Sequence, residues 1–166
     1  MALTNNPLPI VPSNFVLPID ASMQFAAAQS VTATGYINNV NTVVDLGAGR
    51  FDGVLALNLT AIFTTTGDET YKMFLFGSND SAFGNGNVDV LTAYDWGAAA
   101  NRSVATILGT NYSAIPPTNL AGQIYARPFT NLVGAFLFRY AKLYLVEAGT
   151  TPSMTLSAWI TPRNLM

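Results

Sequence analysis

The sequence contains neither cysteine nor histidine. Without cysteine, the chain has no disulfide, no thiolate metal site and no cysteine nucleophile. Without histidine, it lacks the commonest general base and the commonest protein metal ligand. Charged side chains are also scarce, at 10% of 166 residues, against about 25% in an average soluble domain. These deficits lead us to expect a protein that is not an enzyme and that uses no cofactor and no metal.

The sequence also lacks a strong charge of either sign and a long apolar run. Seven basic and nine acidic residues give a net charge of −2, which argues against nucleic acid as a partner. The apolar stretches fall far short of the ~20 residues of a membrane span, so we expect no membrane partner. The first apolar stretch follows no basic residue and is interrupted by prolines, unlike a signal peptide. We therefore expect synthesis in the cytoplasm.

What the chain does have is apolar residues and uncharged polar ones. Half of it is apolar, and it carries 18 Thr and 15 Asn. Surfaces poor in Lys and Glu are typical of protein–protein interfaces, because ordering and desolvating those side chains costs free energy. We expect a chain that works in contact with other subunits; the alternative is an unusually neutral monomer.

Residues 1–19 are predicted to form an extended N-terminal arm, followed by one domain over residues 20–166. Prolines at 7, 9, 12 and 18 fix φ, remove donors and disfavour helix. The arm also carries large apolar side chains, which favours an arm laid along a neighbouring surface over a loose tail.

Beyond the arm, most of the chain alternates with a period of two. Residues 21–31 are Ala- and Gln-rich and predict a turn or two of helix. In VLALNLTAIF, residues 55, 57, 59, 61 and 63 fall on one face, as in a half-buried strand. A second apolar run follows the TTTGDET turn, so residues 54–77 predict a hairpin.

The strongest strand signal lies in residues 135–147, AFLFRYAKLYLVE. Phe138, Tyr140, Tyr144 and Val146 share one face there, with leucines on the other. The final strand alternates through MTLSAWIT, and AGTTPS before it predicts a second hairpin. Seven or eight such strands with almost no helix predict an all-β fold, an antiparallel β-sandwich, with a closed barrel as the alternative. Apolar residues on both faces of several strands predict a further surface packed against the sandwich.

No motif carries catalytic or ligand-binding chemistry. Residues 85–89 alternate possible calcium ligands, but the glycine and glutamate of an EF-hand loop are missing. Gly47-x-Gly49 lacks the third glycine of a dinucleotide fingerprint. The adjacent acids Asp68 and Glu69 are explained by a turn better than by a glycosidase pair. The aromatic residues leave a sugar-binding groove open as an alternative.

Three segments carry a resemblance to a known family. They are FDGVLALNLTAIFTTTGDETYKMFLFGSNDSAFG, LAGQIYARPF and FRYAKLYLVEAGTTPSMTLSAWIT. Across roughly residues 20 to 162 the chain resembles the jelly-roll capsid cement (decoration) proteins of tailed bacteriophages. The longer, proline-rich arm and residues 94–117 do not match the family by motif.

The resemblance implies a jelly roll that forms a homotrimer on the outer capsid surface of the virion. There it would bridge subunits of the major capsid protein and resist the pressure of packaged DNA. The alternative is a carbohydrate-binding jelly-roll module of a tail or fibre protein. For the capsid and subunit interface we predict Pro7, Pro9, Val11, Pro12, Phe15, Leu17, Tyr140 and Tyr144.

Overall fold

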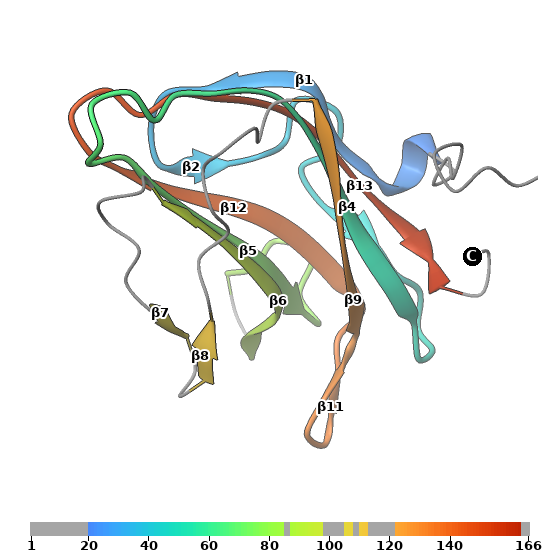
Figure 1. The fold of residues 1–166 in the computed structure, drawn as a ribbon. Helices are drawn as coiled ribbons and strands as arrows, with labels where there is room; N and C mark the ends of the chain where they lie inside the picture. Colours follow the sequence, from blue (N-terminus) through green and yellow to red (C-terminus); the bar gives the residue numbers. More distant parts are fainter. Residues whose placement is uncertain (1–19, 85–86, 98–104, 108–109, 113–121, 164–166) are drawn as a thin grey trace, which may run out of the picture.

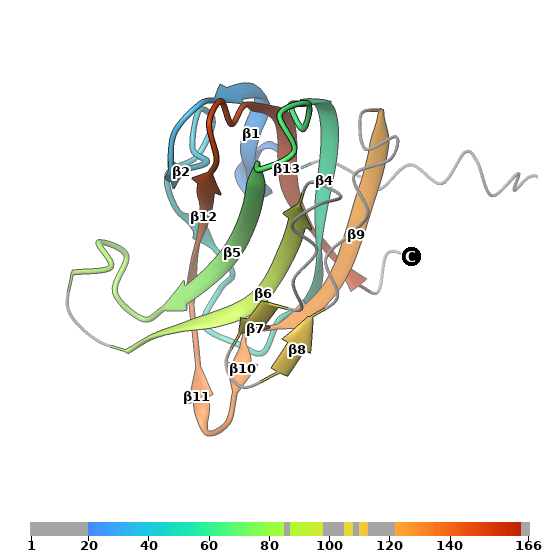
Figure 2. The same ribbon diagram turned by 60° about the vertical axis from the view of Figure 1, so that its left-hand side comes forward.

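The computed structural model describes residues 20–84, 87–97, 105–107, 110–112 and 122–163, which fold as two packed antiparallel sheets (Figures 1 and 2). The first sheet has the strand order β1 (Gln24–Val31), β13 (Met154–Pro162), β4 (Asp52–Ile62) and β9 (Gln123–Thr130). The second has β2 (Gly35–Tyr36), β12 (Tyr140–Ala148), β5 (Thr70–Ser78) and β6 (Val88–Gly97), with β3 (Val44–Asp45) also paired to β12. Two short hairpins lie outside these sheets: β7 (Ala105–Ile107) with β8 (Thr110–Tyr112), and β10 (Leu132–Val133) with β11 (Phe136–Leu137).

The order of the strands is that of a jelly roll. The chain passes between the sheets from β1 to β2 and β3, back to β4, and over to β5 and β6. It then returns to β9, crosses to β12 and ends in β13. The predicted all-β sandwich is thereby confirmed, with jelly-roll topology in place of the closed barrel. The division at residue 19 stays a prediction, because residues 1–19 lie outside the described part.

The core lies between the sheets and follows the alternation that the sequence predicts. Inward side chains include Leu55, Leu57, Leu59, Tyr71, Met73, Leu75, Leu143, Leu145, Leu156 and Ile160, all at most 1% exposed. The predicted inward row of β4 stops before its end: Ala61 is exposed and Phe63 is 37% exposed. The pairing of β4 with β13 shifts register at Thr155 and Leu156, and this irregularity ends the row.

Both predicted hairpins are wrong. Residues 54–77 form β4 and β5, which lie in opposite sheets, and β12 and β13 are likewise in opposite sheets. Alternation shows that a strand has one buried face, but it does not show whether the next strand pairs beside it in the same sheet or crosses to the opposite sheet. The observed hairpin of this region joins β5 to β6, with Tyr71 opposite Trp96 and Ser78 opposite Val88.

The predicted helix over residues 21–31 is also wrong. Only Ala21–Met23 is helical, a 3₁₀ turn whose first residue follows Asp20, and the Asp20 carboxylate accepts a hydrogen bond from the Ser22 amide at 2.9 Å. The alanine-rich remainder is β1, paired with β13. Phe25 within it is fully buried, so core packing overrides a helix propensity that is weak over so few residues.

Side chains tie the loops that cross between the sheets. The Tyr71 hydroxyl donates to the Phe63 carbonyl at 2.5 Å and accepts from the Ser153 amide at 2.9 Å, so it joins the two crossing loops. At the other end, the buried Asn131 amide donates to the carbonyls of Gly49 and Phe138. These bonds fix the end of the sandwich at which β4, β9 and β12 meet their loops.

Candidate functional site

The outer side of the second sheet presents aromatic rings from three adjacent strands. We call this the aromatic face; it consists of Tyr36 of β2, Phe74 and Phe76 of β5, and Tyr140 and Tyr144 of β12. On β12 these residues alternate with the buried residues of the core. Tyr36 is 46% exposed and the others are partly exposed. Tyr140 and Tyr144, two of the predicted interface residues, therefore lie on one outward surface.

The remaining predicted interface residues, Pro7, Pro9, Val11, Pro12, Phe15 and Leu17, lie outside the described residues. Phe138, which the sequence places on the face of Tyr140, is instead 1% exposed. It precedes the first residue of β12 and packs at Gly77, where an added Cβ would lie 2.9 Å from the Phe138 Cβ.

The rings of the aromatic face contact one another across the strands. Strand pairing places Tyr144 opposite both Tyr36 and Phe74. The Tyr36 and Tyr144 centroids are 5.0 Å apart at 67°, and those of Phe76 and Tyr144 are 6.2 Å apart at 50°. Phe74 and Phe76 are nearly parallel, at 5.8 Å and 19°. The Tyr144 plane is thus inclined to those of Tyr36 and Phe76, and these three rings form a contoured surface, while Phe74 and Phe76 lie nearly parallel.

Two cations border the aromatic face. The Lys142 ammonium lies 5.3 Å from the Tyr36 ring centroid and 4.6 Å from that of Phe83, and donates to the Ala82 carbonyl at 3.3 Å. Phe83 belongs to the loop between β5 and β6, which projects from the sandwich in Figure 2. Arg139 lies over the Tyr140 ring at 5.1 Å and pairs with Asp45 at 2.8 Å. Each cation is thus held over the face of a ring.

A second apolar projection is the β10–β11 hairpin at the bottom of Figures 1 and 2. Phe136 is 54% exposed and Leu132 is 38% exposed. The ring of Phe136 is stacked on that of Phe138 at 6.5 Å, so the exposed ring is anchored to the core. The hairpin therefore presents two large apolar side chains on a fixed base.

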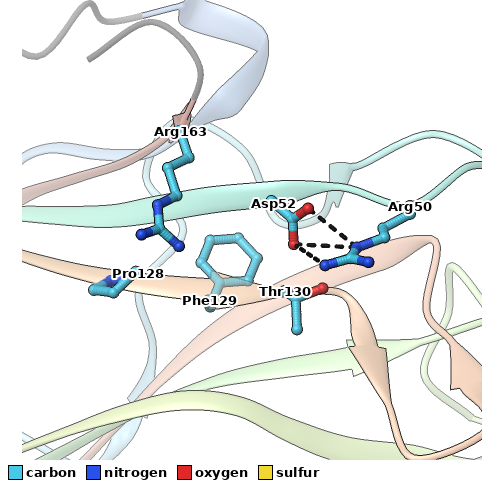
Figure 3. Close-up of a pocket in the computed structure, with 6 residues that line it drawn as sticks. All are labelled: Arg50, Asp52, Pro128, Phe129, Thr130 and Arg163. Atoms are coloured by element: carbon cyan, nitrogen blue, oxygen red, sulfur yellow. Dashed lines mark hydrogen bonds and ion pairs between the residues drawn. The ribbon is translucent and has the colours of Figure 1, made fainter.

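A polar pocket of about 310 Å³ lies at one end of the first sheet, where β4 begins and β9 and β13 end (Figure 3). It is lined by Arg50, Asp52, Pro128, Phe129, Thr130 and Arg163. Asp52 pairs with Arg50 at 3.1 Å, and this bond holds the pKa of Asp52 below its ordinary value, with smaller contributions from Thr130 and the charge of Arg163. The sequence analysis missed this pocket, because its residues come from three distant segments with no local motif.

The sandwich also buries acidic side chains. Glu69 is fully buried, Asp95 is 7% exposed and Glu147 is 8% exposed. Burial raises the pKa of Asp95 and of Glu147. The described ranges contain no group of three or more acidic side chains placed to hold a metal ion. The position of Glu147 could have been predicted, since it alternates in phase with Leu143 and Leu145.

Comparisons with known proteins give little. No family model and no curated protein matches the chain. Among solved structures, a chain from the structure of infectious bursal disease virus Gt strain aligns with a TM-score of 0.31 and 10% identity. The alignment covers 84% of this chain and 32% of that one; similarity this low supports no functional inference. In the part of the chain that the structure describes, no helix is long and apolar enough to cross a membrane.

Proposed function

We propose that this chain is a structural virion protein, a capsid cement (decoration) protein that binds the outer surface of a phage capsid and bridges major capsid subunits. The aromatic face is the observation that carries the proposal. Soluble monomers rarely leave contiguous apolar surface exposed, and such surface commonly marks a protein contact. Here the rings of Tyr36, Phe74, Phe76 and Tyr144 contact one another over adjacent strands.

The composition supports the same function. Aromatic residues dominate the energy of protein interfaces, whereas Lys, Asp and Glu are depleted there. A chain with 10% charged residues can form few ion pairs with a partner, and exposed ion pairs contribute only about 0–1 kcal/mol each. Its binding must therefore rely mainly on apolar and aromatic contacts. As a homotrimer, the chain would engage several capsid sites at once and gain avidity without a strong single contact.

The test is binding to undecorated capsids of the virus that encodes the chain. The double variant Phe76→Ser, Tyr144→Ser removes two rings from the aromatic face without touching the core. We expect at least tenfold weaker binding, because each ring is an interface anchor. The matched control is Ile124→Ser, which removes an apolar side chain that is 53% exposed on β9 and should bind as the wild type does. Circular dichroism and thermal melting verify that both variants fold.

Salt provides a second measurement. Wild-type protein should stay on the capsid when NaCl is raised from about 0.1 M to about 1 M, where the Debye length falls from ~10 Å to ~3 Å. Light scattering should return the mass of a trimer. Equal capsid binding by the double variant and the wild type, or a monomer mass at all concentrations, would contradict the proposal.

A further inference from the structure

The pocket at the end of the first sheet combines three kinds of group. On one side, Arg50 and Asp52 form an ion pair, with the Arg50 Nε 3.1 Å from an Asp52 oxygen. On the other side, the Arg163 side chain points toward Pro128 and Phe129 (Figure 3). Thr130, the last residue of β9, lies beside the ion pair (Figure 3). Cations, an acceptor and apolar rings thus face one space.

The charge of the pocket is not balanced. Two arginines and one aspartate give a net charge of +1, and the Asp52 carboxylate pairs with Arg50. Within the described ranges no hydrogen bond or ion pair holds the Arg163 guanidinium. The chain has only five arginines, and two of them line this pocket. A free guanidinium presents a planar set of donors that matches a carboxylate.

The other groups restrict which carboxylate fits. A plain acidic side chain would offer the Asp52 carboxylate no donor. A hydroxylated ring supplies donors for Asp52 and Thr130, and its C–H face can lie against Pro128. The volume of about 310 Å³ is at the lower end of small-molecule sites. We propose that this pocket binds a carboxylated sugar of the uronic acid class, with the carboxylate on Arg163 and ring hydroxyls on Asp52 and Thr130.

This site shares no residue with the aromatic face. Sugar binding in the pocket and capsid binding by the aromatic face can therefore be tested independently. It gives the chain a glycan-binding activity in addition to any structural role. The sugar binds through charge and hydrogen bonds at the end of the first sheet, and not by stacking on the aromatic rings of the second sheet.

The experiment is a two-dimensional amide NMR titration of the full chain with D-glucuronic acid. D-Glucose is the matched ligand, because it differs only in having a hydroxymethyl group in place of the carboxylate. We expect glucuronate to shift the amide signals of Asp52, Thr130 and Arg163, and glucose to bind at least tenfold more weakly. N-Acetylglutamate carries two carboxylates and no ring hydroxyls, and it should still bind at least tenfold more weakly than glucuronate.

Two variants separate the pocket from a general charge effect. Arg163→Gln should weaken glucuronate binding at least tenfold. Arg139→Gln removes an arginine that pairs with Asp45 outside the pocket and should leave binding unchanged. Absence of shifts with glucuronate, or equal binding of glucose, would overturn the proposal. Equal binding of N-acetylglutamate would overturn the assignment to a sugar.

Discussion

Glu147 is a carboxylate that points into the core without a partner. Both of its side-chain oxygens are buried, and neither forms a hydrogen bond in the described part of the chain. Strand pairing places it opposite Tyr71. Glu69, on the same buried side, differs because its carboxylate accepts hydrogen bonds from the Thr66 hydroxyl and the Gly67 amide. Two buried glutamates thus have opposite hydrogen-bonding states.

This contrast predicts how stability depends on pH. Burial raises the pKa of Glu147, so the folded state holds the proton more tightly than the unfolded state does. The contribution of Glu147 to stability is therefore complete at acidic pH and is lost as pH rises through the raised pKa. Glu147→Gln keeps a buried polar group but removes the carboxylate charge, so it should stabilise the fold at pH 8 and change little at pH 4.

Urea unfolding of both proteins at the two pH values measures the effect. Glu69→Gln is the control: it removes a satisfied carboxylate and should destabilise at pH 8. If Glu147→Gln is no more stable than wild type at pH 8, then Glu147 has a partner or solvent contact in solution.

At the scale of elements, the two loops that cross between the sheets are packed against each other. Gly149 has a φ of 120°, and a Cβ there would lie 2.8 Å from the Glu69 Cα and 2.9 Å from the Asp68 carbonyl oxygen. The Thr150 hydroxyl donates to the Asp68 carboxylate at 2.7 Å. The approach of these loops therefore requires glycine at 149.

Gly149→Ala should destabilise the protein more than Gly47→Ala does. Gly47 also has a positive φ, 88°, but an added Cβ there meets nothing within 4 Å. Gly47→Ala should therefore cost only the strain of placing an alanine at a positive φ, about 1–2 kcal/mol. Gly149→Ala adds a backbone clash, and overpacking costs about 1–3 kcal/mol more. Equal midpoints of chemical unfolding for the two variants would show that the loops separate freely.

The sequence predicts the strands better than their partners. The faces of β12 follow from alternation, because that strand has one buried side. In β13 the alternation ends at Ala158, and Trp159 and Thr161 on the opposite face are buried as well. The pairing does not follow, since the loops after Ile62 and Ala148 are compatible with a turn in one sheet or a crossing. The strand over residues 24–31 cannot be predicted from the sequence, because its alanines favour helix locally. Burial of Phe25 in the core outweighs that preference.

The same limit applies to the candidate sites. Tyr140 and Tyr144 can be placed on one face from their spacing alone. The contacts of Tyr144 with Tyr36 and Phe76 depend on which strands become neighbours, and this is a property of the topology. The pocket residues Arg50 and Arg163 are separated by more than a hundred positions, and no local pattern connects them.

At the scale of the whole molecule, we expect the arm of residues 1–19 to be separable from the sandwich. The described core residues run from Phe25 to Ile160 and lie between the two sheets. Deletion of residues 1–19 should therefore leave the far-ultraviolet circular dichroism of the sandwich unchanged. It should weaken binding to undecorated capsids, because the apolar side chains of the arm can then bury no surface on a neighbour.

The control replaces residues 1–19 with a Gly/Ser sequence of equal length, which keeps chain length but not apolar contacts. It should bind as weakly as the deletion. If either truncated or replaced protein decorates capsids as tightly as the full chain, the arm takes no part in attachment.

The β9 edge of the first sheet limits how neighbouring molecules can pair with each other. β9 ends that sheet, and Pro128 within it lies opposite Val54. Proline has no amide hydrogen, so a strand from another molecule cannot form a continuous ladder along this edge. Molecules held close together on a shared surface would then not join their β9 edges into one continuous sheet. Contact between copies would instead use faces and loops, where symmetry can close it into a finite assembly.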